Sequence, residues 1–123
     1  MRMGRKVTGG RYKSARKKKL FEKRGQSRMV KMADKRTKVM KVRGGYLKLV
    51  SLAQNKVNVM VKGKAKVATI KNVVETPSDR FLARQNILVK SAIVETDLGR
   101  ARITNRPSQE GVVQAVLIED NGK

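Results

Sequence analysis

Hydrophobic and polar residues alternate over short distances through much of this 123-residue chain. Residues 57–61 place Val at every second position, which is the period of a strand with one buried face. Gly63 predicts a turn, and residues 66–74 form the next β-branched run. The almost continuous apolar run over 112–118 predicts a central strand. Several short strands at close spacing favour a mainly β fold, a small barrel or a sandwich.

Two further β-branched runs, 37–43 and 46–52, flank Gly44-Gly45. A Gly-Gly pair between such runs predicts a hairpin with a two-residue loop. That register places Lys41 directly opposite Lys48, and like charges so placed repel each other. A phosphate lying over this face would remove the repulsion. For the glycines Gly44-Gly45 themselves, a plain hairpin turn is favoured over a direct role in binding.

Leu98-Gly99 predicts a second hairpin with a two-residue loop. In that register Val94 meets Ile103 on the inward face. The pairs on the opposite face are complementary in charge: Glu95 with Arg102, and Asp97 with Arg100.

The segment Thr76-Pro77-Ser78-Asp79 predicts the start of one short helix ending near Asn86. Thr76 is expected as N-cap, Pro77 as the first helical residue and Asp79 as the capping-box acid. This helix would place Arg80 and Arg84 on one face.

Positive charge is concentrated at the start of the chain. Residues 1–50 contain 19 Lys and Arg against 2 Asp and Glu, a net charge of +17, whereas residues 51–123 have a net charge of +5. With few apolar residues to bury, residues 1–35 are expected to form a long basic extended arm. Residues 36–123 then form a compact β-domain whose last few residues, from 119, are frayed. Uncompensated charge of this size predicts a polyanionic partner.

Three features of the arm suggest how it works. The run Arg16-Lys17-Lys18-Lys19 lies in a stretch, 14–24, that could become a short helix beside an anion. Thr8-Gly9-Gly10 is either a flexible hinge or a place where bare backbone lies close to a sugar–phosphate surface. Met29 and Met32 are expected to anchor the arm on a hydrophobic surface.

The composition excludes much chemistry. The chain has no Cys and no His, which removes disulfides, Cys/His zinc sites and thiol or imidazole catalysis. No Walker motif or transmembrane run is found, and no secretory signal is expected, because no hydrophobic stretch follows the basic N-terminal residues. No cofactor, metal, membrane or small-molecule substrate is expected either. No DNA-reading motif and few aromatic residues are found, so backbone and shape recognition of a large folded RNA is favoured. A basic nuclease is the rival from another class.

Three stretches resemble the archaeal and eukaryotic type of the small-subunit ribosomal protein eight family. They are RKVTGGRYKSARKKKLFE over 5–22, VRGGYLK over 42–48, and residues 72–118. The chain lacks the long insertion of eukaryotic members and so resembles archaeal members in size. Ser91 and Ser108 stand where the family pattern has Gly.

The resemblance implies a non-enzymatic structural constituent of the small ribosomal subunit in the cytoplasm, bound as a monomer to rRNA and neighbouring ribosomal proteins. An assembly factor or RNA chaperone that shares the domain is the alternative. The charge pattern and the resemblance together give these expected RNA contacts: Arg5, Lys6, Thr8, Gly9, Gly10, Arg11, Arg16, Lys17, Lys18, Lys19, Lys41, Arg43, Gly44, Gly45, Lys48, Arg80, Arg84, Arg102 and Arg106.

Overall fold

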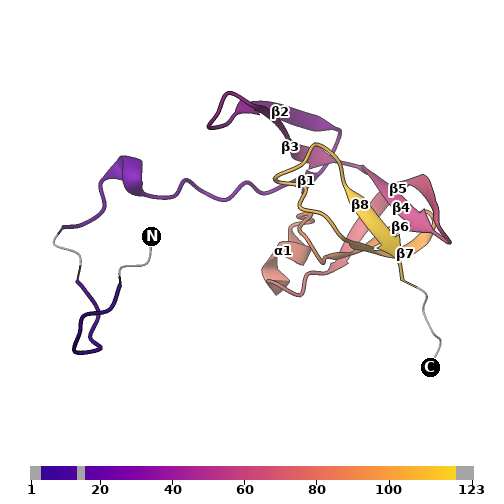
Figure 1. Ribbon diagram of the computed structural model, residues 1–123. Helices are drawn as coiled ribbons and strands as arrows, with labels where there is room; N and C mark the ends of the chain where they lie inside the picture. Colours follow the sequence, from indigo (N-terminus) through magenta and orange to yellow (C-terminus); the bar gives the residue numbers. More distant parts are fainter. Residues whose placement is uncertain (1–3, 14–15, 119–123) are drawn as a thin grey trace.

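A closed five-stranded barrel forms the body of the computed structural model, which describes residues 4–13 and 16–118 (Figure 1). Its strands, in barrel order, are β4 (Lys56–Val61), β5 (Lys64–Glu75), β6 (Ile93–Thr96), β7 (Gly99–Ile103) and β8 (Gln114–Leu117). Neighbouring strands are antiparallel except β8, which runs parallel to β4 and closes the barrel. The mainly β prediction is confirmed, and the fold is a barrel rather than a sandwich.

The barrel core is built from aliphatic side chains on alternate strand positions. Val57 and Val59 point inward and are almost fully buried, which confirms the alternation predicted for β4. The predicted strand over 112–118 has a partner on each side, β4 and β7. It is not buried on both faces, however, because Ala115 points inward whereas Val116 remains 44% exposed. The small interior is filled by one side of each strand, so apolar residues on the other side reach the surface.

A second sheet packs beside the barrel. It contains β1 (Lys31–Met32), β2 (Arg36–Lys41) and β3 (Leu47–Gln54), in the order β1-β3-β2 with β1 parallel to β3. Val30, immediately before β1, belongs to the barrel core and is 1% exposed. Met32 packs partly against the same core, as expected of an anchor, but Met29 is half exposed. Val30 therefore ties the arm to the barrel more firmly than either methionine.

The predicted register of the β2–β3 hairpin is wrong by one residue. The Val42 N–H donates to the Tyr46 carbonyl at 2.9 Å, so the loop contains Arg43 and both glycines, each with φ above +80°. Lys41 consequently pairs with Leu47, and Lys48 pairs with Met40. Because a one-residue slip turns a side chain to the other face, Lys41 and Lys48 lie on opposite faces. The like-charge pair, and the phosphate inferred to relieve it, are not supported.

The β6–β7 hairpin is shifted by two residues from its predicted register. Glu95 pairs with Arg100, and Val94 pairs with Ala101, so the loop is Asp97-Leu98. The Thr96 hydroxyl favours this turn, because it donates to the Gly99 carbonyl at 2.7 Å and accepts the Leu98 N–H at 3.3 Å.

A shift of two positions preserves the faces of a strand. Val94 and Ile103 are buried as predicted, whereas Glu95 and Arg102 are exposed. The predicted pairs of Glu95 with Arg102 and of Asp97 with Arg100 are replaced. Asp97 forms an ion pair with Lys71 of β5 at 3.3 Å.

The helix α1 (Arg80–Arg84) begins later than predicted. Asp79 is its N-cap, with a carboxylate that accepts the Phe81 N–H at 2.9 Å. Thr76 follows the end of β5 and is pulled into the interior, where its hydroxyl has no hydrogen-bond partner among the described residues. The predicted roles of Thr76 as cap and Pro77 as first helical residue are therefore wrong. The predicted end near Asn86 is confirmed, since α1 is followed by a turn in which Asn86 has φ of 51°.

Candidate RNA-binding surface

A compact turn forms the tip of the arm. The Lys6 N–H donates to the Gly10 carbonyl at 2.8 Å, the Gly9 N–H donates to the Lys6 carbonyl at 2.9 Å, and Arg5 pairs with Arg11. Gly9 has φ of 78°, a conformation that other residues adopt at a cost, and a Cβ added there would meet no other atom within 4 Å. The glycines thus build an open turn that holds two arginines side by side, rather than an unstructured hinge.

The basic run that follows is organised by one acid. The Arg16 guanidinium binds the Glu22 carboxylate through two hydrogen bonds of 2.8 Å, and the Lys19 N–H donates to the same carboxylate. Arg16 and then this N–H lower the pKa of Glu22. The 3₁₀ turn η1 (Leu20–Glu22) is the helical part of this segment, and the possible helix over 14–24 begins at residues outside the described ones. Lys17, Lys18 and Lys19 are exposed beside this turn.

The β2–β3 hairpin carries a second group of expected contacts. Lys41 and Arg43 are exposed at or beside the Gly44-Gly45 tip. The Lys48 ammonium instead donates to the Gln109 side chain at 2.6 Å, so it braces the hairpin against the loop before β8.

The third group consists of exposed arginines on the barrel side of the molecule: Arg80, Arg84, Arg102 and Arg106. On α1, Arg80 and Arg84 are four residues apart and share one face. The Arg84 guanidinium lies 5.9 Å from the centre of the Phe81 ring, a cation–π contact on the surface of the helix. Figure 1 shows the arm, the hairpin tip and α1 in three separate places, so the structure does not gather the expected contacts into one patch.

Sequence reasoning left out the lysines of the β4–β5 hairpin. Lys62, Lys64 and Lys66 are exposed around its turn, where Lys62 and Gly63 both have positive φ. The sequence feature that could have identified these residues is a lysine at every second position, which places the two strand residues Lys64 and Lys66 on one face.

The electrostatics of the surface suit a polyanion. Ion pairs join Arg16 to Glu22 and Lys71 to Asp97, and a hydrogen bond from Lys71 is the main cause that lowers the pKa of Asp97. With 31 Lys and Arg and only 9 Asp and Glu, most cations have no acid to neutralise them. Over residues 4–13 and 16–118, no three His, Cys, Asp or Glu side chains gather as a metal site. Within the same residues, no helix is long and apolar enough to cross a membrane.

Comparison with known proteins gives a consistent match along the chain. The family model described as ribosomal protein S8e matches residues 1–118. A protein of Nanoarchaeum equitans named small ribosomal subunit protein eS8 is 39% identical over 120 residues, covering 96% of this chain and 94% of the relative. Proteins of the same name are 40% identical in Haloquadratum walsbyi (98% and 96% covered) and 39% identical in Methanococcus aeolicus (94% and 93% covered).

Proposed function

This chain belongs to the ribosomal protein S8e family, and from that premise we propose that it is a structural constituent of the small ribosomal subunit in the cytoplasm. The arm threads between rRNA helices and neutralises phosphates where they crowd, while the β-domain docks on the RNA surface. The protein acts as a single copy among neighbouring ribosomal proteins, without catalysing a reaction. The observation that carries the proposal is the net charge of +17 over residues 1–50 in a family whose named members are subunit proteins.

The arm makes this proposal physically reasonable. Each lysine that meets a phosphate releases condensed counterions, which supplies affinity without reading a base sequence. The described arm residues before Val30 are exposed to a partner, although two arginines already have contacts: Arg16 with Glu22, and Arg28 with the Ser108 carbonyl and the Met40 sulfur. The contact between Arg16 and Glu22 closes a loop around Lys17, Lys18 and Lys19 and holds these three lysines together at the surface.

The test is the salt dependence of binding to a small-subunit rRNA transcript. Lys17, Lys18 and Lys19 replaced by Ala should flatten the plot of log affinity against log salt by about 2–3, at roughly 0.7–0.9 per phosphate contact. Lys38→Ala with Lys90→Ala is the control, because both lysines are exposed outside the arm, are not among the expected RNA contacts, and should leave the slope almost unchanged. If the slope decreased by the same amount per lysine removed in both variants, a special role for the arm would be refuted.

Two outcomes would favour the rivals. Failure to co-sediment with mature small subunits, with binding to immature particles retained, would indicate an assembly factor or RNA chaperone. Metal-dependent cleavage of the transcript by the purified chain would indicate a nuclease. Stable co-sedimentation and an intact transcript are expected.

A further inference from the structure

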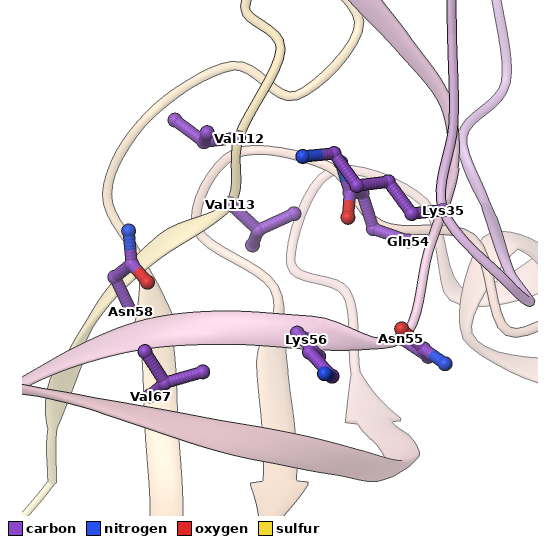
Figure 2. Close-up of a pocket in the computed structure, with 8 residues that line it drawn as sticks. All are labelled: Lys35, Gln54, Asn55, Lys56, Asn58, Val67, Val112 and Val113. Atoms are coloured by element: carbon purple, nitrogen blue, oxygen red, sulfur yellow. The ribbon is translucent and has the colours of Figure 1, made fainter.

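A cleft of about 410 Å³ lies where the barrel meets the three-stranded sheet (Figure 2). It forms at the connection between β3, which ends at Gln54, and β4, which begins at Lys56. Its apolar lining comes from Val67, Val112 and Val113. Val67 and Val112 are 69% and 41% exposed and form an apolar surface open to a ligand, whereas Val113 is buried in the barrel core. The volume falls within the roughly 300–1,000 Å³ typical of small-ligand pockets.

Hydrogen bonds fix the walls of this cleft. The buried Gln54 amide donates to the Ser51 hydroxyl at 3.2 Å and to the Gly111 carbonyl at 3.0 Å, which holds the segment before β8 in place. On the other side, the Asn55 amide donates to the Asp34 carboxylate at 3.2 Å. That contact positions the turn that carries Lys35. A cleft formed in advance in this way loses little entropy when it binds a ligand.

The remaining polar groups of the cleft are unused. Asn58, Lys35 and Lys56 are exposed, and none of their side chains has a hydrogen-bond or ion-pair partner in the part of the chain that the structure describes. Figure 2 shows Asn58 on one side of the cleft and Lys35 on the other, with Val113 between them. One neutral amide and two cations therefore border a single apolar surface.

We propose that this cleft binds one unpaired nucleotide of the RNA, a site that rests on the proposed function. The base packs on the aliphatic side chains of Val67 and Val112, since none of the described residues that line the cleft has an aromatic side chain on which a base could stack. The Asn58 amide, which has both donors and an acceptor, hydrogen-bonds the edge of the base. Lys35 and Lys56 bind the flanking phosphates. A site for phosphate alone would need neither the amide nor the valines.

In the experiment, the full chain is titrated with each of the four nucleoside monophosphates and with inorganic phosphate, and binding is monitored by the NMR shifts of the backbone amides. Shifts of Asn58 and Val67 with at least one nucleotide, and not with phosphate, are expected. Equal shifts with phosphate, or none in the cleft, would overturn the proposal. If the cleft instead receives a protein side chain in the subunit, no nucleotide should shift the amides of the cleft.

Affinity for 12-residue homopolymers of A, C, G and U then tests base reading. Asn58→Ala should remove a preference of about two- to tenfold for one base, the range that one hydrogen bond supplies. Lys35→Ala with Lys56→Ala should lower the salt slope by about 1.4, at roughly 0.7 per contact on single strands. The control is Lys38→Ala with Lys90→Ala, which removes the same charge from exposed residues outside the cleft and should not change the slope.

The outcomes separate this site from the general function. If the arm variant weakens rRNA binding while the Asn58 variant keeps every base preference, the nucleotide site is refuted and the proposed function stands. If the unaltered chain does not bind rRNA at all, the proposed function falls instead. Thermal unfolding of each variant checks that the barrel is intact.

Discussion

Val30→Ala tests whether the root of the arm is part of the barrel. Val30 is 1% exposed within the core, and its carbonyl accepts the Leu88 N–H at 2.8 Å. The substitution removes two methyl groups, each worth about 0.8 kcal/mol of burial. Incomplete collapse of the cavity adds roughly 1 kcal/mol, so the expected loss in unfolding free energy is about 2–3 kcal/mol. For a domain of this size the midpoint should fall by roughly 10–20 °C.

The assay is urea and thermal unfolding of the full chain, with amide exchange at Leu88 as the local readout. Met29→Ala is the matched control, because Met29 is one residue away but 51% exposed. It should change the unfolding free energy by less than about 0.5 kcal/mol. A Val30→Ala variant as stable as the control, with Leu88 still protected from exchange, would show that residue 30 does not share the barrel core.

Three further substitutions follow from individual residues of the β-domain. Lys71→Met should raise the pKa of Asp97 toward its ordinary value, seen by carboxyl NMR titration. Because the folded-state pKa of Asp97 is lowered, the ion pair stabilises the fold above about pH 4, and this contribution is lost as the pH falls through the folded pKa. An Asp97 titration that does not change in the variant would contradict the ion pair. Thr76→Val should raise the unfolding free energy by about 1 kcal/mol, since it removes a buried hydroxyl without a partner at nearly constant volume; a loss of stability in urea unfolding would show that the hydroxyl is satisfied. Ser91→Gly should add about 0.5–1 kcal/mol in the same assay, because Ser91 has φ of 68°, and a neutral result would mean that the turn relaxes without cost.

Local patterns in the sequence were enough to predict most of the strands. The alternation over 57–61, the turn at Gly63 and the inward faces of Val94 and Ile103 depend only on the two-residue period of a strand and on the burial of apolar groups. Ser91, which stands where the family pattern has Gly, adopts positive φ, but no pattern in the sequence itself predicted that turn. The uneven distribution of charge likewise needed no structure.

Registers and partners were decided by the tertiary structure. Loop length could not be read from Gly44-Gly45, because two and three-residue loops accept the same glycines, and one extra residue moved Lys48 to the opposite face from Lys41. Asp97 took Lys71 as its partner because β5, distant in sequence, lies beside it in the barrel.

The cleft shows the same division most clearly. Sequence alone offered no reason to connect Lys35, Asn58 and Val112, which are far apart along the chain. They border one cleft because β8 pairs in parallel with β4, and because the three-stranded sheet joins the barrel through Asn55. Charge density and strand period are local properties that the sequence determined by itself. The meeting of distant side chains depends on barrel closure, which only the complete set of strand pairings decides.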